Sequence, residues 1–422
     1  MQEREKSSEA MAQSYDDQPI SYGLCRLFMV FMLGAGQTTL LISLPAMMEE
    51  TGIGYGLLSG MVAFGTGLFI LSAPVWGKLS DHFGRKPVVV AGVVGIALSF
   101  SLITLSVLAL NQSIINRQQA ILLMFVARGI YGLLASGLYP AVQAWAIDEE
   151  PDNASRSLSR ITASINGGRL VGPLIPAFLI GWGSEIPMAF IAVLTMLLFL
   201  WVILLPLGRT VEPAPSKSEE QSFIRLLSVT WPYLLLACSV TTLFGFLQYV
   251  IGPMLLSVFQ NGAETSRMLS WLMMLAALST IVAHFLFSRW VQGQLSLALK
   301  TGTALLLIGT LMMVLGDNFL WLAAGLVISA ASVTLLTPSY TTIALKQLKH
   351  QQGLLTGTLS MIHTTGYTVG ALLAGFTAGH DSSLMAVIGI VVAAVALVTA
   401  FLCVEVNVEV NSIPMEENYV CD

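Results

Sequence analysis

Residues 77–87 read Gly77-Lys78-Leu79-Ser80-Asp81-His82-Phe83-Gly84-Arg85-Lys86-Pro87, between two long apolar stretches of the chain. Glycine permits turns that are too tight for other residues, so Gly77 and Gly84 are predicted to form a turn here. Asp81 and Arg85 can form an ion pair at the mouth of the two flanking helices. The segment therefore predicts a charged turn whose ion pair holds two helices together.

The composition is that of a membrane protein. Hydrophobic residues make up 55% of the chain and charged residues only 10%, where an average soluble domain has about 25% charged residues. This excludes a water-soluble globule. The net charge of −5 is small and the charges are concentrated between and beyond the apolar segments, which disfavours a nucleic-acid partner. The four cysteines have no spacing suited to a metal or a disulfide framework, and we interpret them as free thiols.

Twelve segments are long and apolar enough to span a bilayer, which takes about 20 apolar residues. The first follows a polar leader and is too long for a signal peptide. The sequence predicts spans over residues 23–47, 56–79, 88–110, 119–142, 158–181, 187–208, 230–256, 267–290, 297–317, 319–343, 353–376 and 383–404.

A polar linker at residues 209–229 divides these spans into two sets of six. Its prolines and alternating charges predict a solvated segment. We therefore expect an N-terminal six-helix bundle over 23–208 and a C-terminal one over 230–404. The tails 1–22 and 405–422 complete the chain. Two such halves are typical of membrane proteins whose bundles are related by a pseudo-two-fold axis along the membrane normal.

Lysine and arginine determine the predicted orientation. They gather in the linker and in the loops after the even-numbered spans, whereas the opposite loops carry only Arg117 and Arg267. Because positive loops stay on the cytoplasmic side, both termini are predicted to be cytoplasmic.

Residues 77–87 resemble the loop between helices 2 and 3 of the major facilitator superfamily, whose pattern is G-x-x-x-D-x-x-G-R-[RK]. Gly77, Asp81, Gly84, Arg85 and Lys86 match every position of that pattern. The resemblance implies an all-α membrane protein with twelve transmembrane helices in two six-helix bundles. It also implies that the loop controls a conformational change.

Three further stretches agree with this resemblance. Arg128 and Gly132 match the R-x-x-x-G element of helix 4, and Gly168, Gly172 and Pro173 resemble the G-x-x-x-G-P element of the antiporter branch. The usual pair of glycines after that element is replaced by Pro176-Ala177. Asp148 and Arg156 resemble the acidic and basic residues that contact the helix 2–3 loop in related efflux proteins, and small residues let helices approach closely.

Two arginines, Arg128 and Arg169, fall near the middle of predicted spans, where no Asp or Glu is found. An arginine at the bilayer centre is costly unless it faces water, a carboxylate or an anionic ligand. Guanidinium groups bind carboxylate or phosphate in bidentate fashion, which favours an anionic substrate. For Arg128, a part in proton coupling is an equal alternative, as the resemblance implies. For Arg169, pairing with backbone carbonyls is the alternative.

Other polar residues inside the predicted spans are candidates to line the same cavity, although each can equally join two helices by a hydrogen bond. They are Gln37, Tyr131, Asn166, Gln248, Tyr249, Tyr340, His363 and Tyr367. Histidine titrates near neutral pH, so His363 is also a proton-coupling candidate. The others are Arg128 and Asp81, the latter with Asp148, and the substrate itself can also carry the proton.

The resemblance implies a secondary transporter of the drug:proton antiporter branch in a bacterial inner membrane, monomeric and using a small molecule and protons. An anionic substrate such as a citrate-type siderophore is favoured. A multidrug pump for lipophilic or cationic compounds, an uptake symporter and a non-transporting receptor remain alternatives. The chain has no metal-ligand spacing, phosphate-binding loop or nucleophile elbow, so we expect no cofactor and no enzymatic activity.

Overall fold

The computed structural model describes residues 21–149, 154–204, 220–316, 318–347, 352–378 and 382–412, and these ranges contain helices and no strand. The chain divides into two compact units. The first comprises Met1–Ser43 with Leu68–Ala214, and the second comprises Leu44–Gly67 with Pro215–Asp422. The end of the first long helix and the start of the second therefore belong to the second unit.

Two long helices, α2 (Ser21–Thr51) and α3 (Tyr55–Phe83), contribute to both units. The rest of the first unit consists of α4 (Arg85–Asn111), α5 (Arg117–Ala135), α6 (Leu138–Glu149), α7 (Ala154–Val171), α8 (Leu174–Leu179), the short 3-10 helix η2 (Ile180–Trp182) and α9 (Ile186–Leu204). Helix α4 packs against α5, α6 and α9.

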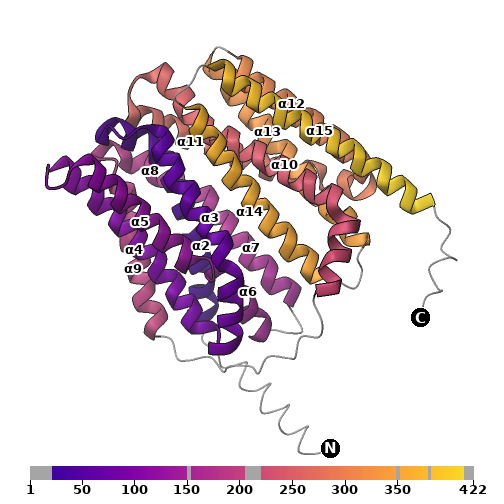
Figure 1. The fold of residues 1–422 in the computed structure, drawn as a ribbon, viewed down its shortest axis with the longest axis horizontal. Coiled ribbons are helices and arrows are strands. Elements are labelled where there is room, and N and C mark those ends of the chain that lie inside the picture. Colours follow the sequence, from indigo (N-terminus) through magenta and orange to yellow (C-terminus); the bar gives the residue numbers. More distant parts are fainter. Residues whose placement is uncertain are drawn as a thin grey trace, which may run out of the picture. The chain divides into compact units, whose positions relative to one another are not determined.

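The second unit continues with α10 (Glu220–Phe259), α11 (Gly262–Gly293), α12 (Leu295–Leu315), α13 (Phe319–Gln347), α14 (Gln352–Thr377) and α15 (Ser382–Ser412). Helix α10 packs along α14 and α15, and α12 packs along α13 and α15 (Figure 1).

Helices cover all twelve predicted spans where the structure describes them, with short interruptions inside the spans 119–142 and 158–181, and the predicted fold class is confirmed. Within the described ranges, eleven helical stretches are long and apolar enough to cross a membrane, and α14 covers the remaining predicted span. Helix α10 begins at Glu220, ten residues before its predicted start. The predicted linker residues 209–219 lie outside the described residues, as do tail residues 1–20 and 413–422.

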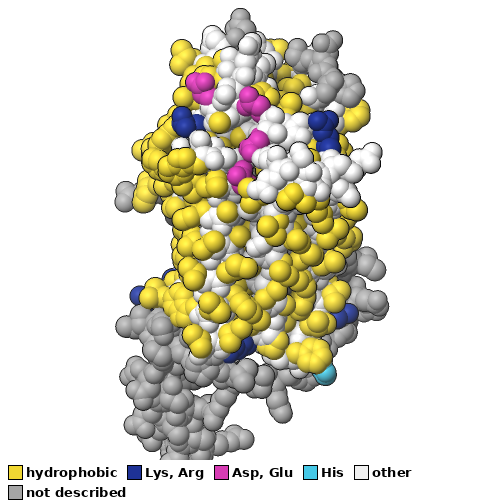
Figure 2. Space-filling view, turned by 90° about the vertical axis from the view of Figure 1, so that its left-hand side faces the viewer, with side chains coloured by type: hydrophobic (Ala, Val, Ile, Leu, Met, Phe, Trp, Pro, Cys, Tyr) yellow, Lys and Arg dark blue, Asp and Glu magenta, His cyan; other side chains and the backbone are white. Residues whose placement is uncertain are grey.

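The helix surfaces are those of a protein surrounded by lipid. Along α9 an exposed apolar face repeats every three or four residues, as one side of a helix does. It consists of Phe190, Val193, Leu197, Leu200 and Leu204, which are 43–81% exposed. Figure 2 shows hydrophobic side chains gathered over a broad area of one face, with acidic side chains gathered at one end of it. A helix that exposes such a stripe to solvent would be unstable in water, which supports a multi-pass membrane protein.

The structure corrects the predicted charged turn. Helix α3 continues through Gly77 to Phe83, and α4 starts at Arg85, so Gly84 alone separates them. Gly84 has φ of 88°, a left-handed conformation that glycine adopts at no steric cost. Gly77 is an ordinary helical residue, and a Cβ built there would meet no atom within 4 Å. The prediction that Gly77 shapes the turn was therefore wrong.

The predicted span 119–142 is broken into α5 and α6 at residues 136–137. Pro140 has no backbone N–H to bond to the Ser136 carbonyl, and two side chains of α3 also contribute to the break. The Ser72 hydroxyl donates to the Gly132 carbonyl oxygen (2.9 Å), and the Trp76 indole donates to the Leu133 carbonyl oxygen. These carbonyls would otherwise accept from the next turn of an uninterrupted helix. Helix α7 likewise ends at Val171, two residues before Pro173, because proline has no backbone N–H.

Candidate functional site

Tyr131 is the centre of a polar cluster inside the first unit. It lies on α5 one turn after Arg128, so the two side chains share a helix face. The guanidinium carbon of Arg128 is 4.0 Å from the centroid of the Tyr131 ring, a cation–π distance. Both residues are buried, Arg128 at 2% and Tyr131 at 1% exposure. The ring also stacks on Phe69 of α3, with centroids 6.1 Å apart.

Two other helices add polar groups to this cluster. Gln37 of α2 donates from Nε2 to the Tyr131 hydroxyl over 3.1 Å. Arg169 of α7 interacts electrostatically with Tyr131 and is exposed within the unit, as is Asn166 one turn before it. Residues from α2, α5 and α7 that are far apart in sequence are thus brought together. We call Gln37, Arg128, Tyr131 and Arg169 the arginine cluster.

The arginine cluster is rich in hydrogen-bond donors and positive charge. Two guanidinium groups carry up to ten N–H donors between them and no acceptor. Helices α5 and α7 contain no Asp or Glu, and the only acidic residues on α2 are Glu49 and Glu50 near its end. The chemistry available is binding of an anion, since nothing in the cluster is a nucleophile paired with a base.

The crossing of α7 and α2 brings Arg169 near the cluster. A Cβ built on Gly168 would lie 2.0 Å from the Phe31 carbonyl oxygen, and one built on Gly172 would lie 2.0 Å from the Thr38 hydroxyl. The Thr39 hydroxyl donates to the Gly172 carbonyl oxygen over 3.1 Å. The two helices can approach this closely only because these positions have no side chain.

The charged turn forms a second cluster in the first unit. Arg85 donates from Nε to Asp148 of α6 over 3.0 Å. One of its terminal nitrogens lies 2.6 Å from Asp81 and 3.0 Å from the Ser80 hydroxyl. The turn between α3 and α4 is therefore tied to the end of α6. Exposed ion pairs contribute about 0.2–1 kcal/mol each, so the connection is weak enough to break during a conformational change.

Two other residues were assigned to this cluster from the sequence. Lys86 is half-buried in the first turn of α4, and Arg156 is exposed near the start of α7.

A tyrosine–histidine pair lies in the second unit. The Tyr340 hydroxyl of α13 is 2.7 Å from Nε2 of His363 on α14, and the two ring centroids are 5.8 Å apart. Tyr340 is fully buried, whereas His363 is partly exposed. A histidine in such a pair can exchange a proton with its surroundings while the tyrosine fixes the orientation of its ring.

The remaining cavity candidates lie on α10 and α14. Tyr367 packs edge-on against Phe244, with centroids 6.4 Å apart. Gln248 and Tyr249 are half-buried on α10, and the Tyr249 backbone oxygen accepts a hydrogen bond from the Tyr55 hydroxyl over 2.8 Å. Tyr249 therefore contributes a structural contact through its backbone.

Sequence reasoning missed several contacts made by ordinary residues. Ser80 is part of the Arg85 cluster, Phe69 supports Tyr131, and Tyr55 joins α3 to α10. The Glu49 carboxylate at the end of α2 accepts from the Gly262 amide at the start of α11. None of these residues stands out by type or spacing, because their roles depend on how neighbouring helices are rotated.

The chain matches the Major Facilitator Superfamily over residues 26–292. It is 28% identical to the multidrug resistance protein MdtG of Dickeya zeae over 219 residues, which cover 50% of each protein, so the match spans about half the length of that relative. It is 25% identical to multidrug resistance protein 1 of Bacillus subtilis, over 83% of this chain and 87% of that protein. A multi-drug resistance efflux pump, PmrA of Streptococcus pneumoniae, is 26% identical over 57% of this chain and 58% of its own length.

Solved structures share the fold. The nucleoside transporter NupG superimposes with a TM-score of 0.68 at 11% identity, over 91% of this chain and 98% of that one. The human organic anion transporter MFSD10 superimposes with a TM-score of 0.61 at 20% identity, over 92% of this chain and all of that one. Because the family match covers more than half of the sequence and the helical fold agrees with it, the predicted membership is confirmed: the chain belongs to the Major Facilitator Superfamily.

Proposed function

We propose that this protein is a secondary transporter, not an enzyme, that exports small organic anions by alternating access in exchange for protons. The observation that carries the proposal is that Arg128 and Gln37 both contact Tyr131, while Arg169 on a third helix interacts with Tyr131 electrostatically. The cluster thus contains two guanidinium groups, and that of Arg169 is exposed. Guanidinium groups bind carboxylates in bidentate fashion, so an anionic substrate such as a carboxylate siderophore would fit them.

The relatives support export as the direction of transport. Three of them are named multidrug resistance proteins or efflux pumps. The charged turn would then control access from the cytoplasmic side, with Arg85 released from Asp81 and Asp148 when the two bundles move. The close crossing of α2 and α7 at Gly168 and Gly172 would let these helices move as one body.

For the proton site we propose the pair of His363 and Tyr340. No Asp or Glu lies in the central part of a described helix, so the usual acidic proton carrier has to be replaced. His363 is partly exposed and its ring nitrogen is hydrogen-bonded to a buried hydroxyl. Proton binding at His363 would add a charge to the second unit and change how strongly Tyr340 holds the ring.

The protein would lie in a bacterial inner membrane as a monomer with both termini in the cytoplasm, because its lysines and arginines gather on that side. Residues 23–208 and 230–404 would form the two moving bundles, joined by the linker 209–229. Arg156 would add positive charge near the charged turn.

A second candidate function is export of lipophilic cations, which the multidrug relatives favour. The arginine cluster opposes it, since two guanidinium groups repel a cation. Removing positive charge from the cluster should therefore weaken binding of an anionic substrate, whereas it should strengthen binding of a cationic one.

Binding to the purified full-length protein separates the two. We would titrate a citrate-type siderophore and, separately, a lipophilic cation into wild type, Arg169→Ala and Arg160→Ala. Arg160 is an exposed arginine on the same helix and controls for loss of surface charge. Losing a charged hydrogen bond of about 1.5–3 kcal/mol should weaken siderophore binding by roughly ten- to a hundredfold in Arg169→Ala only. If the cation binds wild type and Arg169→Ala equally and the siderophore binds neither, the anion proposal is overturned.

A further inference from the structure

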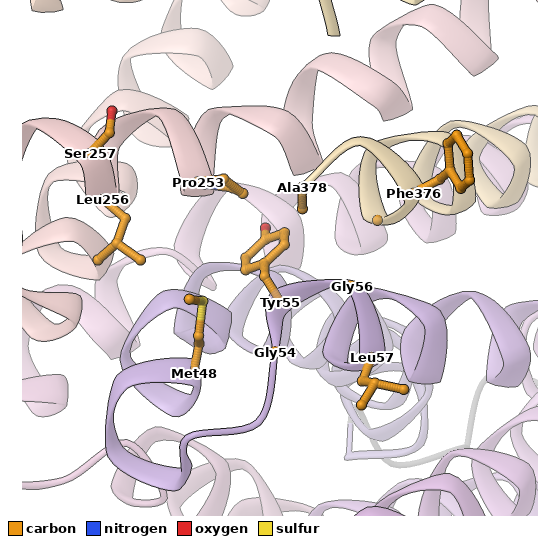
Figure 3. Close-up of a pocket in the computed structure, with 11 residues that line it drawn as sticks. Met48, Gly54, Tyr55, Gly56, Leu57, Pro253, Leu256, Ser257, Phe376 and Ala378 are labelled. Carbon is orange, nitrogen blue, oxygen red and sulfur yellow. The ribbon is translucent and has the colours of Figure 1, made fainter. Parts of the chain in front are cut away.

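A pocket of about 740 Å³ is formed by residues of the second unit. Its wall is built from the end of α2, the start of α3 and the last turns of α10 and α14. Figure 3 shows Tyr55 projecting from the start of α3 toward Pro253 of α10 and Ala378 after α14. The volume falls within the range of about 300–1,000 Å³ that is usual for small-molecule sites.

The lining contains no charged side chain, and its hydroxyl groups are already engaged. The Tyr55 hydroxyl donates to the Tyr249 carbonyl oxygen over 2.8 Å, and the Ser257 hydroxyl donates to the Met254 carbonyl oxygen over 2.7 Å. The other walls are apolar, including Met48, Leu57 and Leu256. Drug-sized ligands are usually oriented by a few polar side chains, and the two in this lining already donate their protons elsewhere.

The pocket is continuous with surfaces that face lipid. Leu57, 49% exposed, lines the pocket and begins an exposed stripe on α3 that continues every seven residues through Phe64 and Leu71. On α14 the exposed residues Leu372 and Phe376 form a similar stripe, and Phe376 lines the pocket. The occupant can therefore enter from the bilayer without crossing the protein.

We propose that this pocket binds the acyl chain of a membrane phospholipid, held between the start of α3 and the last turns of α10 and α14. An alkyl chain needs no hydrogen-bond partner, so an apolar pocket that opens toward lipid can hold it by van der Waals packing. Water is a poor occupant, because a buried water needs two to four polar partners. The inference rests on the membrane-spanning fold and is independent of which substrate is transported.

Photolabelling of the full-length protein in phosphatidylcholine liposomes tests this. The probe is phosphatidylcholine with a photoreactive diazirine on one acyl chain, and mass spectrometry maps the labelled residues. We expect labelling around Leu57, Leu256 and Phe376 in excess of that around Leu71. Leu57→Trp places a larger side chain at the pocket wall and should reduce this labelling to the level found around Leu71.

Leu71→Trp is the matched control, because Leu71 lies on the same stripe of α3, is 74% exposed and does not line the pocket. It should leave labelling of the pocket unchanged. If Leu57→Trp does not fold, Phe376→Ser removes another part of the wall and should also lower labelling. Equal labelling at Leu57 and Leu71 would show that both residues contact only the lipids that surround any membrane protein. Loss of labelling on adding a lipophilic cation would show that the pocket binds such a compound instead. Either result would overturn the proposal.

Discussion

Tyr131 is the residue on which the account of substrate binding depends most. Its ring contacts the Arg128 guanidinium, and its hydroxyl accepts from Gln37. The two interactions use different parts of the side chain, so they can be separated by substitution.

Tyr131→Phe keeps the ring beneath Arg128 and removes the acceptor for Gln37. A neutral hydrogen bond is worth about 1 kcal/mol, so binding of the siderophore should weaken only about fivefold. Tyr131→Leu removes both interactions and should weaken binding further. Calorimetric titration of the two variants measures the difference, and equal losses would show that the hydroxyl alone matters.

The pair of Tyr340 and His363 allows a separate prediction about protons. His363→Gln keeps a polar side chain but cannot titrate, so export driven by a pH gradient should fall to the level seen without a gradient, while siderophore binding persists. Flux from proteoliposomes with and without an imposed gradient measures this. His284→Gln is the matched control, because His284 is an exposed histidine on α11. A gradient response that survives in His363→Gln would remove His363 from the proton pathway.

At the scale of single residues, the sequence predicted the two arginines because a charge inside an apolar span is rare. It could not predict that both interact with Tyr131, since this depends on the rotation of α5 and α7 about their axes. Asn166 and Gln248 were chosen by polarity alone; Asn166 is exposed on α7 and Gln248 is half-buried on α10.

At the scale of helices, the crossing of α2 and α7 should be sensitive to a single methyl group. A Cβ on Gly168 would meet the Phe31 carbonyl oxygen at 2.0 Å, whereas one on Gly167 would lie 3.8 Å from its nearest neighbour, on the Phe31 ring. Gly168→Ala should therefore cost about 1–3 kcal/mol of stability by overpacking. Gly167→Ala should cost little. Thermal unfolding of the two purified variants compares them, and equal melting temperatures would contradict the close crossing.

The ion pairs at the turn between α3 and α4 should contribute much less to stability than the crossing of α2 and α7. Asp148→Asn leaves the shape of the side chain and weakens its ion pair with Arg85, which should cost only about 0.2–1 kcal/mol. Transport should nevertheless fall, because the pair would act in only one of the conformations. Thermal unfolding and flux measured on the same variant test this, and wild-type flux would show that the ion pair has no part in transport.

Hydropathy predicted where the helices lie, but it did not predict where a helix is interrupted within a span. Apolar length predicted every span, and Pro173 signalled the end of α7. The break after Ala135 is signalled by Pro140, which has no N–H to bond to the Ser136 carbonyl, but hydropathy alone treats this stretch as one span. Ser72 and Trp76 of another helix also take hydrogen bonds that would continue α5, and the sequence carries no information about these contacts.

At the scale of the whole molecule, family membership accounts for the two-unit, all-helical architecture and leaves the substrate to the chemistry of the site. Members of one fold transport unrelated compounds, as the similarity to a nucleoside transporter and to an organic anion transporter illustrates. The charge of the arginine cluster is therefore the feature that should determine which compounds this protein carries.

Reversing that charge would show whether the arginine cluster selects anions. Flux of a citrate-type siderophore and of a lipophilic cation would be measured in proteoliposomes containing wild type, Arg169→Glu or the surface control Arg160→Glu. We expect that wild type and Arg160→Glu carry the anion, and that Arg169→Glu loses anion flux and gains cation flux. Cation flux in wild type that is unchanged by Arg169→Glu, with no anion flux in any variant, would contradict this expectation.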